Sequence, residues 1–134
     1  MGDSRRHIRE GFHTVTPYLI VQGAPRLIDF MVQTLDAEEV RRDLRTDGTI
    51  MNAEVRIADS VVELAEAGEQ WPARPGSLHV YVRDTDATYR RALTAGGSSL
   101  YEPADMPYGE RSAGVLDPTG NHWYFATYAA SAGD

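Results

Sequence analysis

The sequence has no cysteine, no lysine and no long apolar run. Without cysteine, neither a disulfide framework nor thiol chemistry is available, so we expect a cytoplasmic protein. Without lysine, Schiff-base catalysis is excluded, because that chemistry needs a side-chain amine. A membrane-spanning helix needs about 20 apolar residues, and the N-terminus also lacks the apolar core of a signal peptide. We therefore expect no membrane partner.

The chain also lacks a basic face. Its 13 basic residues, all of them arginine, are outnumbered by 20 acidic residues, which gives a formal charge of −7. The arginines are scattered apart from one short segment, residues 5–9, which we expect to be solvated. Nucleic-acid binding needs a concentrated basic surface, so no nucleic-acid partner is expected. The exclusive use of arginine, with many alanines and glycines, is typical of a GC-rich bacterial genome.

The length and composition indicate one globular domain. A chain of 134 residues can bury one real core but not two independent ones. Its 42% hydrophobic and 25% charged residues are ordinary values for a soluble domain. We expect flexible ends at residues 1–10 and 130–134.

The most informative feature is a weak internal repeat. Residues 16–63 are echoed by residues 77–124 at a constant offset of 61 positions, as from Leu19 to Val80. Each half reads as strand, helix and three strands, over residues 14–65 and 77–128, with a connector at 66–76. Two such units cannot cover their own apolar sheet faces and would fold against each other. The predicted fold is α+β, with two βαβββ modules forming a cup-shaped, mostly antiparallel sheet.

Residue patterns place the elements of each half. Asp84 is a typical helix N-cap, and the pair Gly96-Gly97 is typical of a helix end. β-branched and aromatic runs predict the strands, and turn residues such as Asp47-Gly48 separate them. The predicted helices cover 25–35 and about 85–95, and the predicted strands cover 15–21, 39–44, 50–57, 60–65, 77–82, 98–102, 111–116 and 122–127.

Three motifs resemble a known family. They are Val82-Arg83-Asp84-Thr85-Asp86-Ala87, Tyr108-Gly109-Glu110-Arg111-Ser112-Ala113-Gly114, and Asp117-Pro118-Thr119-Gly120-Asn121 with Trp123 and Ala126-Thr127 beyond it. Together they resemble the vicinal oxygen chelate superfamily, and the second motif resembles its glyoxalase-like branch of unassigned function. The resemblance covers about residues 14–128 and implies the same two-module cup. It also implies a homodimer, because many relatives complete or cover the cup by pairing two chains.

The same resemblance bears on metal binding. Metal-dependent members of that family place ligands at four positions, which align here with Thr16, Glu63, Ser77 and Tyr124. Metal-using relatives have His, Glu or Gln there, so only Glu63 fits, and neutral hydroxyl groups are poor substitutes. His79 and His122 could act with Glu63 as relocated ligands, although three relocated donors would be a demanding coincidence. We therefore expect no metal and no other cofactor.

Strand alternation predicts which side chains line the cup. The mixture of aromatic rings and polar tips suits a planar, partly apolar ligand that also needs hydrogen bonds. Each tyrosine could instead fill the concave space or a dimer interface, and the two histidines could be ordinary structural residues. The predicted cup residues are Thr16, Tyr18, Glu63, Ser77, His79, Tyr81, His122 and Tyr124.

Three further residues have two interpretations each. Glu63 could accept a proton, with His79 as its catalytic partner if the protein is an enzyme, or it could form a salt bridge to an arginine. Arg111 could bind an anionic ligand group, or it could join a hairpin to a neighbouring acid. Trp71, in the connector, could be a ligand-binding lid, an intersubunit plug or a local cover for the core. Asp117 and its neighbours are assigned to the turn and not to catalysis.

These observations lead to two functional hypotheses. The first is a metal-independent small-molecule binding protein that sequesters an aromatic antibiotic or metabolite, as the bleomycin-resistance branch of the resembled family does. The alternative is a lyase or isomerase that uses the relocated ligands Glu63, His79 and His122, or metal-free acid–base catalysis. Standard glyoxalase I activity is not expected, because that chemistry needs a metal to stabilise an enediolate.

Overall fold

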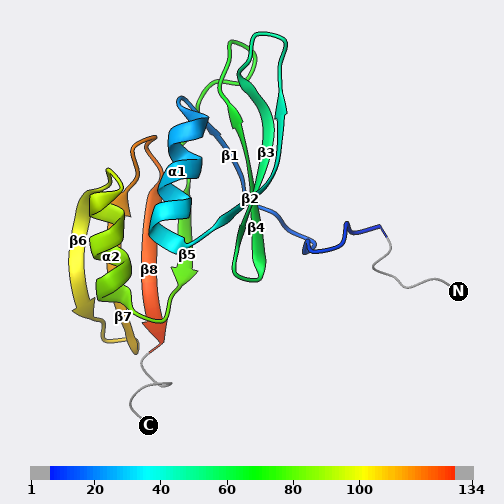
Figure 1. Ribbon diagram of the computed structural model, residues 1–134. Helices are drawn as coiled ribbons and strands as arrows, with labels where there is room; N and C mark the ends of the chain where they lie inside the picture. The colour runs from blue at the N-terminus through cyan, green and yellow to red at the C-terminus, as the bar shows by residue number, and fades with distance from the viewer. Residues whose placement is uncertain (1–6, 129–134) are drawn as a thin grey trace, which may run out of the picture.

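The computed structural model describes residues 7–128 as two consecutive βαβββ modules (Figure 1). The first contains β1 (Tyr18–Val21), α1 (Ala24–Leu35), β2 (Glu38–Leu44), β3 (Ile50–Ile57) and β4 (Ser60–Glu66). The second contains β5 (Ser77–Tyr81), α2 (Thr85–Thr94), β6 (Ser98–Asp105), β7 (Glu110–Leu116) and β8 (His122–Tyr128). The predicted α+β fold of two such modules is confirmed. Most of the expected flexible ends lie outside the described residues.

Each module forms its own four-stranded sheet. The strand orders are β1-β4-β3-β2 and β5-β8-β7-β6, so the same topology occurs twice. In each sheet the first strand runs parallel to the last, and the other neighbours are antiparallel. Tyr18 lies opposite Glu63 in one sheet, and His79 lies opposite Tyr124 in the other. These two pairs are related by the 61-position offset, so the sequence repeat is a structural repeat.

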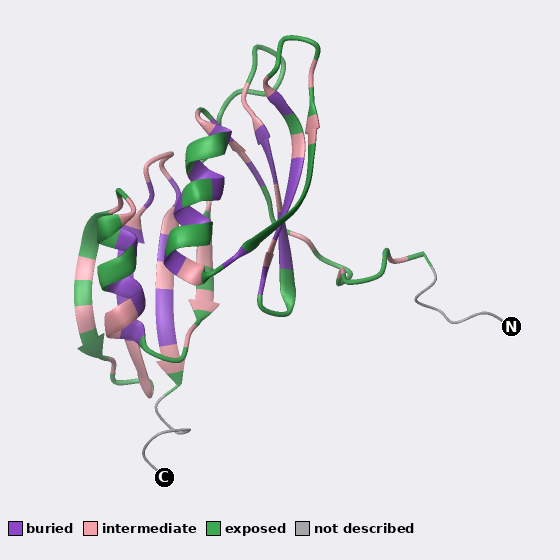
Figure 2. Ribbon diagram, in the orientation of Figure 1, coloured by how far each residue is buried: buried purple, intermediate pink, exposed green. Residues whose placement is uncertain are grey.

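One hydrophobic core joins the two modules. α1 packs on the first sheet and against α2, which packs on the second sheet (Figure 1). Phe30 of α1 contacts Trp123 of β8, with ring centroids 5.9 Å apart. Figure 2 shows buried residues on the inner sides of both helices and along β8. The helices therefore cover one face of each sheet and leave the opposite, concave face open.

The two helices are short and are capped in different ways. Asp84 caps α2 as predicted, since its side chain accepts a hydrogen bond from the Ala87 N–H at 3.0 Å. α1 starts after Gly23, which has no side chain to cap it, and the Glu66 carboxylate of β4 accepts from the N–H groups of Gly23 and Ala24 instead. Neither helix, nor any other in the described part of the chain, is long and apolar enough to cross a membrane.

The first strand is shorter than the sequence predicts. Regular pairing begins at Tyr18, although a strand was expected from residue 15. Val15 is 81% exposed, so its β-branched side chain has no core to enter. Pro17 has no N–H to donate, although its carbonyl oxygen accepts from the Glu63 N–H at 2.9 Å. High β-propensity therefore does not produce a strand where the packing surface is missing.

Candidate functional site

The predicted cup residues lie on two separate concave faces. Tyr18 and Glu63 project from the first sheet, whereas His79, Tyr81 and Tyr124 project from the second. Leu19, Val80 and their alternating neighbours point toward the helices, as strand alternation predicts. The single mixed cup expected from the sequence is thus divided between two sheets within one chain.

The first concave face ends in a cavity of about 520 Å³. Trp71 forms one wall and is 62% exposed, while Tyr18 on β1 is 50% exposed. The connector that carries Trp71 folds back on itself, since the Gly68 N–H donates to the Trp71 carbonyl at 2.9 Å. Trp71 thus lines a cavity, and its predicted role in ligand binding stays a prediction. The lining residues are Tyr18, Ile20, Arg45, Met51, Ala65, Glu66, Gln70 and Trp71.

Two carboxylates lie side by side in the middle of the first face. Glu63 accepts a hydrogen bond from Asn52 Nδ2 at 3.1 Å, and no salt bridge to an arginine is formed within residues 7–128. Its cross-strand neighbour Glu54 is only 4% exposed. Arg9 binds Glu54 through two hydrogen bonds of 2.6 and 2.8 Å and thereby compensates its charge. Local sequence patterns do not reveal this contact, because 45 residues separate the two partners.

The second face holds an acid–base cluster around Glu110. Tyr81 Oη donates to Glu110 Oε2 at 2.7 Å, and His79 Nε2 lies 3.3 Å from Glu110 Oε1. The rings of His79 and Tyr81 meet edge to face at 4.8 Å. The hydrogen bond to Glu110, together with the negative charge of that carboxylate, raises the pKa of the Tyr81 phenol. Sequence analysis did not single out Glu110 as a site residue, although it lies in one of the family motifs.

A second group of aromatic rings lies beside this cluster. Tyr101 and Tyr124 are stacked, with centroids 6.3 Å apart and ring planes 21° apart. A Cβ atom at Gly114 would lie 2.5 Å from the Tyr101 ring, so the missing side chain makes room for that ring. Tyr101 is also held by Ser112 Oγ at 2.6 Å, and Tyr124 lies 3.0 Å from His122 Nδ1. Tyr101, also missed from the sequence, extends the predicted aromatic surface.

A cleft of about 390 Å³ lies where the two modules meet. It is formed by residues 13, 15–17, 57–62 and 78–81, and it brings Thr16 close to His79 and Tyr81. Ser77 is exposed at the start of β5 and does not line this cleft. Three of the predicted cup residues therefore share one space within a single chain.

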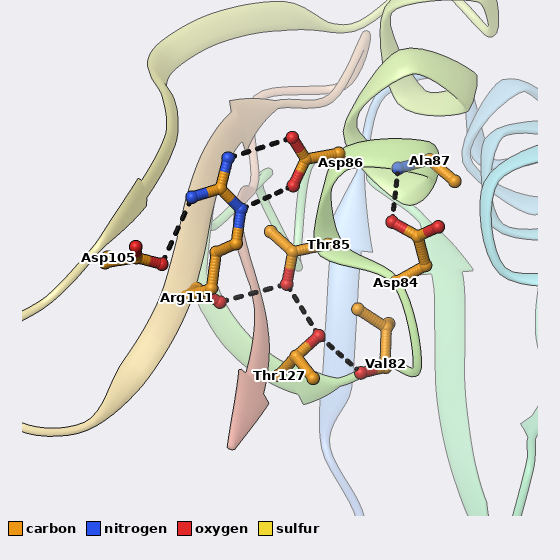
Figure 3. A network of polar contacts seen from close by, with 8 residues as sticks. All are labelled: Val82, Asp84, Thr85, Asp86, Ala87, Asp105, Arg111 and Thr127. Carbon is orange, nitrogen blue, oxygen red and sulfur yellow. Dashed lines mark hydrogen bonds and ion pairs between the residues drawn. The ribbon is translucent and has the colours of Figure 1, made fainter. Parts of the chain in front are cut away.

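Arg111 is engaged by acidic partners (Figure 3). Its guanidinium donates to both carboxylate oxygens of Asp86, at 2.6 and 2.9 Å, and to Asp105 at 3.1 Å. The hydrogen bond from Arg111 lowers the pKa of Asp86. Thr85, next to Asp86 at the start of α2, donates to the Arg111 carbonyl at 2.9 Å. Arg111 thus joins its hairpin to neighbouring acids, which was the second interpretation of this residue. The geometry gives no support to its predicted role in ligand binding.

The residues at the family's metal positions do not fit a divalent ion. Thr16 and Ser77 offer neutral hydroxyl groups, which are weak donors. The three alternative metal ligands lie on different sheets, because Glu63 belongs to the first sheet whereas His79 and His122 belong to the second. Across residues 7–128, no three or more His, Asp or Glu side chains are grouped so that they could hold a metal.

Comparison with known proteins identifies the family. The model of the Glyoxalase/Bleomycin resistance protein/Dioxygenase superfamily matches residues 11–125. An uncharacterized protein of Mycobacterium bovis is 33% identical over 120 residues, covering 81% of this chain and 79% of the relative. The anthracycline biosynthesis protein DnrV of Streptomyces peucetius is 59% identical over 39 residues, which are 29% of this chain and 14% of that protein. The crystal structure of TioX from Micromonospora sp. ML1 has the same fold, with a TM-score of 0.74 at 23% identity over 87% of this chain and 98% of that one. The chain therefore belongs to the Glyoxalase/Bleomycin resistance protein/Dioxygenase superfamily.

Proposed function

We propose that the protein is a metal-independent small-molecule binding protein that sequesters an aromatic antibiotic or metabolite in the bacterial cytoplasm. The observation that carries the proposal is the set of exposed aromatic side chains on the concave faces. Trp71 and Tyr18 lie on the first face, and Tyr81, which is 64% exposed, lies on the second. Exposed aromatic side chains gathered on a sheet face are typical of a binding site, and stacked rings favour a planar ligand.

We propose further that two chains associate as a homodimer. Each concave face is open within one chain, and the aromatic residues on it are exposed to solvent. β1 and β5 are edge strands of the two sheets, and both faces are open, so we propose that a second copy covers them. Light scattering after gel filtration should give a mass of about twice 14.8 kDa. A mass of one chain at micromolar concentration would contradict this assembly.

Calorimetric titration with an anthracycline tests the binding function. This probe is planar and polycyclic, and the Streptomyces relative is named for anthracycline biosynthesis. We expect saturable binding that weakens about tenfold in Trp71→Ala, since aromatic anchors dominate binding energy. Val32→Ala removes an exposed apolar side chain on α1 and serves as the control. Unchanged affinity in both Trp71→Ala and Tyr81→Ala would show that the aromatic faces are not the site.

The Glu110 cluster favours a second candidate function, metal-free acid–base catalysis in a lyase or isomerase. Its histidine and its phenol each lie within hydrogen-bond distance of the carboxylate. Under this alternative, Glu110→Gln or Glu63→Gln would abolish turnover of a bound compound and leave its affinity unchanged. Under the binding function, no turnover occurs and these substitutions have little effect. Product analysis by mass spectrometry after incubation separates the two.

A further inference from the structure

Arg45 occupies a well-defined position at the rim of the first cavity. It follows the last residue of β2 and opens the turn that leads into β3. The Arg45 N–H donates to the Thr49 carbonyl at 2.8 Å, and the Gly48 N–H donates to the Arg45 carbonyl at 3.0 Å. Asp47 orders the same turn by accepting from the N–H and hydroxyl groups of Thr49. The guanidinium is therefore carried by a fixed turn.

Arg45 forms no direct salt bridge within residues 7–128, although it lies close to one acid. Hydrogen bonds from Thr49, together with the charge of Arg45, lower the pKa of Asp47. Arg45 Nη1 donates to Thr49 Oγ1 at 3.0 Å and its Nη2 to the Glu66 carbonyl at 2.9 Å, and both acceptors are neutral. Within residues 7–128, the other half-buried arginines, Arg56 and Arg111, each form a salt bridge. A guanidinium has five N–H donors, so Arg45 keeps several for another acceptor. This arrangement is unexpected in a chain that has 20 acidic residues.

The one carboxylate that lines the cavity is already engaged. Glu66 accepts from the N–H groups of Gly23 and Ala24, at 2.9 and 2.8 Å, so its charge is stabilised by the start of α1. The remaining walls are largely apolar and include Trp71 and Tyr18. A volume of about 520 Å³ matches the size of a drug-like ligand. The cavity thus combines aromatic walls with one arginine that forms no direct ion pair.

We infer that the first cavity selects aromatic ligands bearing one anionic group, and that Arg45 binds this group. The inference deepens the proposed small-molecule binding function and rests on it. A carboxylate suits the planar guanidinium, because the two can form paired hydrogen bonds assisted by charge. Trp71 and Tyr18 contact the ring system of the same ligand, and Arg45 supplies the specificity for its charge.

A matched pair of ligands tests this role. 2-Naphthoate and 2-naphthamide have the same ring system and nearly the same shape, but only the first is charged at neutral pH. Calorimetry on the full chain should give about tenfold tighter binding of 2-naphthoate. Arg45→Gln should remove this preference, and Arg45→Lys, which keeps the charge, should retain part of it. Arg83→Gln, at an exposed arginine of the second module, should leave it unchanged.

The possible results separate this inference from the binding function. Equal affinity for the two probes, or a preference that persists in Arg45→Gln, would overturn the role of Arg45 and leave small-molecule binding intact. Binding of neither probe would overturn the inference, and together with a negative anthracycline titration it would overturn the binding function as well. Circular dichroism of each variant verifies that it is folded.

Discussion

At the scale of single residues, Asp117 organises the turn before the last strand. Its buried carboxylate accepts from the Thr119 N–H and hydroxyl groups, from Asn121 Nδ2 at 3.0 Å and from Trp123 Nε1 at 2.7 Å. Asn121 in turn accepts from the Gly76 N–H at 2.9 Å, which ties the connector to this turn. The motif is therefore structural, as its sequence indicates. The Asp117 carboxylate is fully engaged in hydrogen bonds that hold the turn.

We predict that Asp117→Ala lowers the free energy of unfolding by about 3 kcal/mol, because several buried donors lose their acceptor. Urea unfolding followed by circular dichroism measures the change. Asp47→Ala is the matched control, since Asp47 makes the same pair of hydrogen bonds to Thr49 in an exposed turn. Similar losses in the two variants would show that the buried network at Asp117 adds nothing.

The contact between Tyr81 and Glu110 predicts a pH dependence. The pKa of Tyr81 is raised above its ordinary value of 10.0 by the hydrogen bond to Glu110. This contact stabilises the folded protein below pH 10, and the stabilisation is lost as the pH rises through the raised pKa. Ultraviolet titration should show a late phenolate transition that disappears in Tyr81→Phe and moves to lower pH in Glu110→Gln. Tyr108→Phe should leave the late transition in place, and a late transition that survives Tyr81→Phe would be evidence against the assignment.

Only part of the site could be predicted from the sequence. Strand alternation placed Tyr18, His79 and Tyr81 on the open faces, because that rule depends on local geometry alone. Arg45 was missed because it comes directly after the charged strand predicted at residues 39–44, which already contains Arg41 and Arg42. Its importance depends on the cavity that it borders, whose other walls come from residues distant in the sequence, such as Tyr18 and Trp71. Long-range contacts determine the lining of a site, and local patterns do not contain that information.

At the scale of secondary-structure elements, the boundaries set by local patterns were predicted well, and those set by long-range contacts were not. The strand expected at residues 50–57 matches β3, because its turn signals and apolar pattern are local. The last strand continues through Tyr128, beyond its predicted end at 127, because it pairs with Glu110 at the end of β7. The predicted start of the first strand at residue 15 was wrong. Val15 has the β-propensity of a strand residue, but it has no surface to pack against.

Capping of α1 gives a prediction at this scale. Glu66 of β4 supplies the acceptor that Gly23 lacks, so a strand of the same sheet stabilises the helix start. We predict that Glu66→Ala lowers the free energy of unfolding by about 1–2 kcal/mol. Glu69→Ala, an exposed acidic residue a few positions further on, is the control and should change stability little. Thermal unfolding measures both, and an equal effect of the two variants would rule out the capping role.

At the scale of the whole molecule, the two modules depend on one another. Their sheets are separate, yet the buried residues of both form one cluster through α1, α2 and β8. Phe30 enters this cluster from the first module and Trp123 from the second, and both are almost fully buried. Because neither module can cover its own apolar sheet face, we expect the chain to unfold as one cooperative unit.

Removing the ring of Phe30 tests this coupling. We predict that Phe30→Ala lowers the free energy of unfolding by about 3–5 kcal/mol, the usual cost of deleting a buried aromatic side chain. In a Trp71→Phe background, Trp123 is the single tryptophan, so its fluorescence reports on β8 and the core around it, while circular dichroism reports on both modules. The two signals should move together to lower urea concentration, although the substitution lies in the first module. Unfolding of the first module at a concentration where Trp123 remains native would show that the modules fold independently.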